Sequence, residues 1–108
     1  MTWTVHKFGG TSLADAACFR RVADIVVGQP EGNLAVVVSA IRGVTDLLLG
    51  LIDKASSDQP VEASIDDLRS RYEAIVRELL SKDRANGLIQ QFSQELENID
   101  SVLKALSV

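Results

Sequence analysis

A chain of 108 residues with a formal net charge of −4 has room for one small domain and carries no surplus of positive charge. Its 15 acidic residues outnumber its 11 basic ones, which disfavours general binding to nucleic acids or to anionic membranes. The longest apolar runs are too short to span a bilayer, no signal peptide is expected, and the single Cys18 excludes an intramolecular disulfide, so we expect a reducing cytoplasm.

The first part of the chain predicts two strands joined by a helix. Residues 2–8 alternate and are rich in β-forming side chains, which predicts a strand that ends at two glycines. Apolar residues at helical spacing predict a helix over residues 14–27. A turn cluster at 28–33 leads into "LAVVVSA", residues 34–40, an apolar run typical of a strand covered on both faces. This order predicts a right-handed unit with parallel strands.

The second part of the chain predicts helices only. Apolar residues recur at spacings of three and four over residues 44–55, 65–80 and 88–106. Ser64 and Asp67 resemble a capping box at the start of the second of these helices. The stretch "KDRANG" before the last helix reads as a turn or a short break, so the last two helices predict an antiparallel hairpin.

The fold class is therefore α/β, with a β-α-β-α segment over residues 1–57 followed by a helical hairpin over residues 64–108. Two strands make a poor sheet, because both outer edges carry unpaired backbone groups. We expect further strands from chain beyond residue 108 or from another molecule.

Two loops are the candidates for function, because parallel sheets bind ligands at the carboxyl ends of their strands. In "KFGGTS", Gly9 and Gly10 would let a phosphate approach the backbone, Lys7 adds a full charge, and the following helix would offer free N–H groups. The alternative is a tight glycine turn beside a solvated lysine. The spacing matches neither a Walker A loop nor G-x-G-x-x-G.

The second loop, "SAIRGVT", supplies hydroxyls and one guanidinium. Ser39 and Thr45 suit a small polar ligand, although Thr45 equally suits a helix N-cap. Arg42 could hold a carboxylate or a phosphate, or lie in solvent. His6 and Cys18 have no metal-ligating or nucleophilic partners nearby in sequence, so both read as structural.

Together the motifs resemble those of aspartate kinases. "HKFGGTSLAD" resembles the first strand and loop of that family, and "VVVSAIRGVTDLLLGLID" resembles its second strand and following helix. Both occur in the expected order and separation, and the hairpin resembles an insertion in the same family. The resemblance implies a partial three-layer α/β/α sandwich of the amino-acid kinase type.

The resemblance also implies an activity, which is transfer of the γ-phosphoryl group of ATP to the β-carboxylate of L-aspartate. It implies L-aspartate and ATP as partners, Mg²⁺ with the ATP but not held by residues identifiable in this chain, and a homo-oligomer. It further implies roles for six residues: Lys7 as the catalytic residue, Lys7, Gly9, Gly10 and Ser12 at the ATP phosphates, and Ser39 and Thr45 at the aspartate.

Family members continue well beyond 108 residues, with further substrate, adenine and regulatory residues. The chain thus resembles the N-terminal part of an aspartate kinase, free-standing or fused to a second enzyme, and we expect it to be inactive alone. Two alternatives stay open: another amino-acid kinase with a carboxylate substrate, or a non-catalytic interaction or regulatory module with the same fold.

Overall fold

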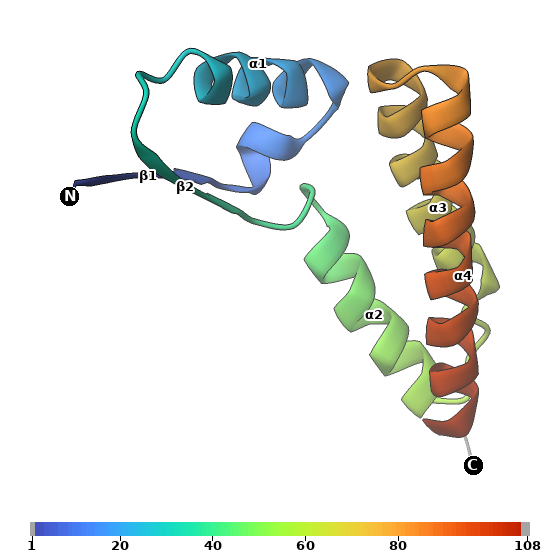
Figure 1. Ribbon diagram of the computed structural model, residues 1–108. Coiled ribbons are helices and arrows are strands. Elements are labelled where there is room, and N and C mark those ends of the chain that lie inside the picture. The colour runs from blue at the N-terminus through green and yellow to red at the C-terminus, as the bar shows by residue number, and fades with distance from the viewer. Residues whose placement is uncertain (1, 107–108) are drawn as a thin grey trace. The chain divides into compact units, whose positions relative to one another are not determined.

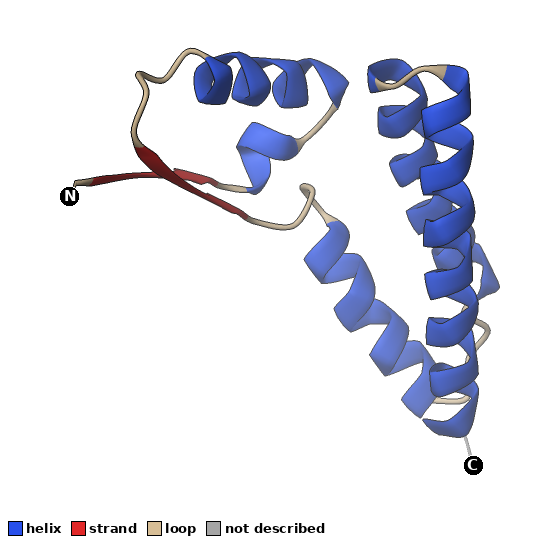
Figure 2. Cartoon of the chain, in the orientation of Figure 1, coloured by secondary structure: helices blue, strands red, loops and turns tan. Residues whose placement is uncertain are grey.

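The computed structural model describes residues 2–106, which divide into two compact units between Gly43 and Val44. The first unit holds β1 (Trp3–Phe8), the 3-10 helix η1 (Gly10–Leu13), α1 (Ala16–Val27) and β2 (Asn33–Val38). The second holds α2 (Val44–Ser56), α3 (Glu62–Leu79) and α4 (Lys82–Leu106) (Figures 1 and 2). Over residues 2–106, no helix has the length and apolar character needed to cross a membrane.

The two strands pair in parallel, as their order with the intervening helix predicts. The register runs from Trp3 opposite Asn33 to Phe8 opposite Val38, without a bulge. Beyond the last pair, the amide of Ser39 donates a hydrogen bond of 3.0 Å to the carbonyl of Phe8. Both strands therefore deliver their carboxyl ends, and the loops that follow, to the same edge of the sheet.

Helix α1 lies along one face of the sheet (Figure 1). Phe8, at the end of β1, is buried on this face and shares a cavity lining with Val22 and Ile25 of α1. On the opposite face, the side chains of Trp3 and Val5 are 60% and 63% exposed.

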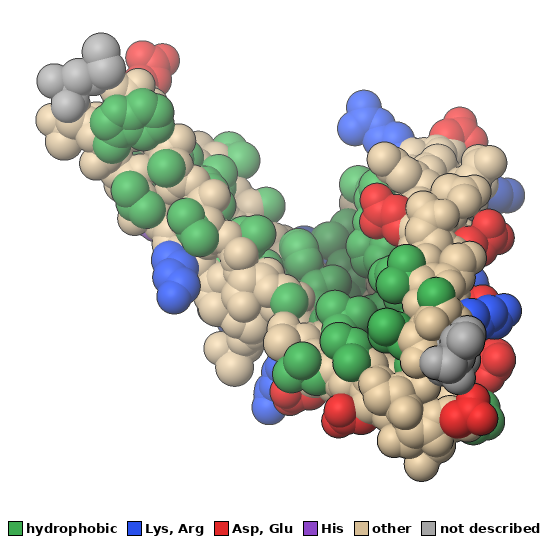
Figure 3. Space-filling view, turned by 90° about the horizontal axis from the view of Figure 1, so that it is seen from below, with side chains coloured by type: hydrophobic (Ala, Val, Ile, Leu, Met, Phe, Trp, Pro, Cys, Tyr) green, Lys and Arg blue, Asp and Glu red, His purple; other side chains and the backbone are tan. Residues whose placement is uncertain are grey.

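The expectation that the second strand is covered on both faces is wrong for the described residues. Val36, Val37 and Val38 are 41%, 50% and 58% exposed. The strand thus has the composition of a buried element without the corresponding cover. Figure 3 shows apolar side chains at the molecular surface.

The second unit is held by a continuous apolar core between its three helices. The buried members are Leu51, Ala55, Val61, Ile65, Leu68, Leu96 and Leu103. Toward the closed end of the α3–α4 hairpin, Val76, Ala85 and Ile89 form a smaller cluster. Helix α2 packs into the main cluster with one face only, because Leu49 and Ile52 on its other side are exposed.

The break expected at "KDRANG" is absent, because α4 begins at Lys82 and continues through Gly87. Ala85 and Ile89 are buried one helical turn apart against α3, and this packing outweighs the low helix propensity of the glycine. The hairpin turn is therefore confined to the few residues around Ser81, whose Oγ accepts a 3.4 Å hydrogen bond from the amide of Arg84.

The predicted capping box at Ser64 is also wrong. Helix α3 begins at Glu62, and its N-cap residue, Val61, makes no side-chain capping bond. Ser64 lies inside the first turn, where its Oγ accepts a 2.7 Å hydrogen bond from Nζ of Lys54. Val61 is buried in the core, so apolar packing fixes the start of α3 and leaves Ser64 to tie α3 to α2.

Asp15 caps the start of α1. Its Oδ1 accepts a 2.9 Å hydrogen bond from the amide of Cys18. The hydrogen bonds from Cys18, with the positive charge of Arg21 adding to them, lower the pKa of the Asp15 carboxyl below its ordinary value of 3.8. The ionised carboxylate is therefore the form that stabilises this end of the helix.

The end of α2 holds a strained residue. The amide of Gln59 donates a hydrogen bond of 2.7 Å to the carbonyl of Lys54, and the amide of Asp58 donates one of 3.2 Å to the carbonyl of Ala55. These two bonds form a Schellman motif, whose αL position is occupied by Asp58 with φ of +57°. Glycine suits this position better, and a negative charge at a helix C-terminus is unfavourable.

We expect Asp58→Gly to raise the free energy of unfolding by about 1 kcal/mol, because it relieves the αL conformation and removes the charge. Asp58→Asn, which removes only the charge, should gain less. Urea unfolding of the three proteins measures both effects, and an Asp58→Gly variant no more stable than the parent would contradict this description of the motif.

For Asp15, the expected effect depends on pH. The folded-state pKa lies below the unfolded one, so the cap stabilises fully above pH 3.8 and its contribution is lost as the pH falls through the lower folded value. At pH 7, Asp15→Ala should lower the melting temperature, whereas the melting temperature of Asp15→Asn should stay close to that of the parent. The gap between parent and Asp15→Ala should narrow in acid, and a gap that is independent of pH would argue against the cap.

Candidate functional site

The loops that follow β1 and β2 lie against each other, as their place at the carboxyl edge of a parallel sheet predicts. A Cβ atom placed on Gly10 would lie 3.5 Å from the carbonyl oxygen of Ala40 and 3.7 Å from Cα of Arg42. Together with the bond between Ser39 and Phe8, this contact joins "KFGG" and "SAIR" into one surface within the first unit.

The glycine pair serves this surface through the absence of side chains rather than through unusual backbone angles. Gly9 is extended, with φ of −79°, and neither Gly9 nor Gly10 is among the described residues with positive φ. A Cβ atom on Gly9 would meet nothing within 4 Å, so the backbone there is open to an approaching group. The described glycines with positive φ are Gly32, at +149°, and Gly43, at +84°.

Lys7 supplies positive charge beside these glycines. It is exposed, pairs with Val37 in the sheet register, and lies on the face opposite to His6 and Phe8. Residues 1–43 contain four basic and three acidic residues, a net charge of +1, whereas residues 44–108 contain seven basic and twelve acidic ones, a net charge of −5. The negative balance of the chain therefore belongs to the helical unit, and the unit with the candidate loops is weakly positive.

The helix that follows Gly9 is η1, not α1, which changes the expected source of free N–H groups. The amide of Ser12 bonds to the carbonyl of Gly9 at 3.0 Å. The N-terminus of α1 is occupied by the Asp15 carboxylate, which would repel an anion. The expectation that this helix terminus helps to cradle phosphate is therefore corrected, and the open backbone of Gly9 with the charge of Lys7 remains.

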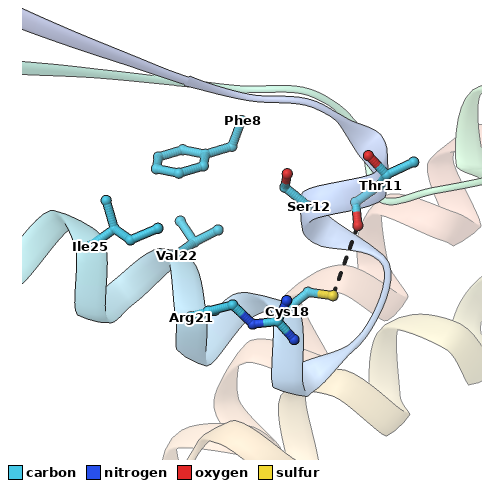
Figure 4. Close-up of a pocket in the computed structure, with 7 residues that line it drawn as sticks. All are labelled: Phe8, Thr11, Ser12, Cys18, Arg21, Val22 and Ile25. Carbon is cyan, nitrogen blue, oxygen red and sulfur yellow. Dashed lines mark hydrogen bonds between the residues drawn. The ribbon is translucent and has the colours of Figure 1, made fainter.

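Ser12 lies in η1, is exposed, and lines a cavity of about 180 Å³ between η1 and α1. Figure 4 shows Ser12 and Thr11 on one side of this space and the apolar side chains of Val22 and Ile25 on the other. Cys18 is half-buried, and its Sγ donates a weak hydrogen bond of 3.8 Å to the carbonyl of Thr11. The thiol thus links α1 to η1, in keeping with a structural role.

Of the two hydroxyl residues proposed for a small substrate, only Ser39 lies in the first unit. It follows β2 directly and is exposed. Thr45 is the second residue of α2, in the second unit, and is also exposed. Because α2 begins at Val44, Thr45 lies inside the helix, and the alternative in which it is the N-cap is wrong.

His6 lies on the face of β1 that α1 covers. Its ring stacks on Phe8 with centroids 6.1 Å apart, and its Nε2 is buried without a hydrogen-bond partner in the described structure. Among residues 2–106, no group of three or more His, Cys, Asp or Glu side chains is arranged to hold a metal ion.

Comparison with known proteins identifies relatives that match almost the whole chain. A model described as the amino acid kinase family matches residues 2–104. The chloroplastic bifunctional aspartokinase/homoserine dehydrogenase 1 of Zea mays is 33% identical over 107 residues, 98% of this chain and 12% of that protein. Lysine-sensitive aspartokinase 3 of Escherichia coli K12 is 35% identical over 104 residues, 96% of this chain and 22% of that protein.

Solved structures agree with the sequence relatives. The crystal structure of E. coli aspartokinase III in complex with aspartate and ADP is 36% identical and matches with a TM-score of 0.77 over 96% of this chain and 22% of that one. The fold is thus a partial α/β fold of the amino-acid kinase type, similar to that of aspartokinases, and the chain spans only an eighth to about a fifth of these relatives. The match over residues 2–104 shows that this chain belongs to the amino acid kinase family.

Proposed function

We propose that residues 1–108 are the N-terminal portion of the catalytic domain of an aspartate kinase, which transfers the γ-phosphoryl group of ATP to the β-carboxylate of L-aspartate. The observation that carries this proposal is the apposition of the two strand-end loops, with Gly10 against Ala40 and Arg42. The similarity to aspartokinases supports the choice of substrate over other amino-acid kinases. The product, 4-phospho-L-aspartate, is the first intermediate of lysine, threonine and methionine biosynthesis.

Within this proposal, Lys7 is the catalytic residue and contacts the transferring phosphates. The backbone of Gly9 and Gly10 lies beside them, and Ser12 is at the same end of the site. Lys7 is exposed and Gly9 has no neighbour within 4 Å of its Cβ direction, so both are accessible to a charged ligand. Phosphoryl transfer asks a protein mainly for positioning and for neutralisation of charge, and a lysine beside open backbone meets this need.

Ser39 and Thr45 are the proposed contacts for aspartate, on the strength of their motif. An oxygen of the substrate β-carboxylate forms the new bond to the γ-phosphorus, the bond from that phosphorus to the bridging oxygen breaks, and the electron pair leaves with ADP. A carboxylate is already ionised at neutral pH, so the step needs no general base. Mg²⁺ arrives with ATP as part of the substrate and would neutralise charge on the phosphates.

The rest of the active site belongs, in this proposal, to sequence beyond residue 108. The relatives are about four to eight times as long as this chain. The additional strands and helices of such a longer polypeptide would cover Val36–Val38 and the outer side of α2, which the described elements leave exposed. We place the protein in the cytoplasm, as a homo-oligomer without nucleic-acid or membrane partners.

Lys7 provides the direct test of this function in the intact polypeptide. Lys7→Gln should lower kcat by about 10²–10³-fold, because a charge aimed at the transferring phosphoryl group is lost. ATP-dependent formation of aspartyl phosphate, trapped with hydroxylamine, measures the rate. Lys82→Gln, which makes the same change at an exposed position in α4, is the matched control and should leave kcat unchanged. Equal activity of Lys7→Gln and the parent would refute the assignment.

The 108-residue chain by itself should show no turnover in the same assay, since it holds only part of the proposed site. Intact polypeptide assayed in parallel, with aspartate, glutamate and acetylglutamate, serves as the positive control and tests substrate choice. Robust phosphorylation of aspartate by the isolated chain would contradict the proposed division of the site. An intact polypeptide that is inactive on every carboxylate would favour the non-catalytic module.

A further inference from the structure

We infer that Arg42 is a second cationic contact for the nucleotide phosphates, in addition to Lys7. The inference rests on the proposed function and extends it to a residue outside the two groups assigned to phosphate and aspartate. Arg42 lies in the loop after β2, four residues beyond the end of that strand, and it is exposed.

The backbone of Arg42 lies against the "KFGG" loop, which is the proposed phosphate site. The Cβ direction of Gly10 points at its backbone, 3.7 Å from Cα and 4.0 Å from the amide nitrogen. The carbonyl of Ala40, 3.5 Å from the same point, shows that the contact extends along the loop. A Cβ atom at residue 10 would be in ordinary van der Waals contact with the second loop, so a side chain longer than that of alanine would have to turn away from it.

The chemistry of the side chain suits a phosphate. A guanidinium offers paired N–H donors to two oxygens of one phosphate, and it is always charged at neutral pH. Lys7 is the second-to-last residue of one strand and Arg42 follows the other, so the parallel register brings two of the four basic residues of the first unit to one sheet edge. A triphosphate carries enough negative charge to engage both.

The alternative ligand for Arg42 is a carboxylate of the amino-acid substrate. We favour the phosphates, because the backbone of Arg42 lies beside Gly10, which is one of the residues assigned to them. The two ligands are separable by experiment, since each would raise a different Michaelis constant.

The test uses Arg42→Gln and Arg42→Lys in the intact polypeptide, with Arg20→Gln on α1 as the matched control for loss of a positive charge in the same unit. We expect Arg42→Gln to raise KM for ATP about tenfold and to leave KM for aspartate unchanged, with Arg42→Lys intermediate. Calorimetric titration should show the same weakening for ADP and none for AMP, which lacks the outer phosphates.

The inference would be overturned by an unchanged KM for ATP, by a rise confined to KM for aspartate, or by equal weakening of AMP and ADP binding. Arg20→Gln should match the parent, and if it weakens ADP as much as Arg42→Gln does, general electrostatics rather than contact explains the effect. A parent protein that binds ADP but does not phosphorylate aspartate would refute the proposed function alone, and the ADP titrations would still decide the role of Arg42.

Discussion

The parallel pairing of β1 with β2 is the constraint on which the candidate site depends. Six residues of each strand pair in unbroken register, and the bond from Ser39 to Phe8 continues the pairing by one step. Parallel strands must end at the same edge, so two loops that are thirty residues apart in sequence become neighbours there. Gly10 lies where the two loops meet, and its Cβ direction points at the backbone of Ala40 and Arg42.

The apolar surface that the described elements leave open has a physical meaning for the proposed function. Three successive valines in β2 and an apolar side of α2 are exposed, whereas the core between α2, α3 and α4 is closed. β-Branched apolar residues are seldom exposed to solvent along a whole strand. In the proposed enzyme, which is several times longer, these surfaces would become interior, and the loops at the sheet edge would gain the remaining walls of their pocket.

The sequence was informative wherever a local pattern decided the structure. The alternation before Gly9 predicted β1, the order of strand, helix and strand predicted the parallel pair, and both strand-end loops were located. It was not informative where packing decided: burial of Ala85 carried α4 through Gly87, and burial of Val61 set the start of α3 ahead of Ser64. The cap at Asp15, which withdraws the α1 terminus from anion binding, was seen only in the structure. The roles of Lys7, Ser12, Ser39 and Thr45 remain predictions.

Hydrogen–deuterium exchange of the intact polypeptide, with and without ADP, tests the central claim most directly. The claim is that the "KFGG" loop and the loop after β2 hold the nucleotide phosphates. It predicts slower exchange in peptides covering residues 7–13 and 39–43 when ADP is bound, with no change in the hairpin peptides over α3 and α4. Protection that spares both loops, in a protein shown to bind ADP, would contradict it.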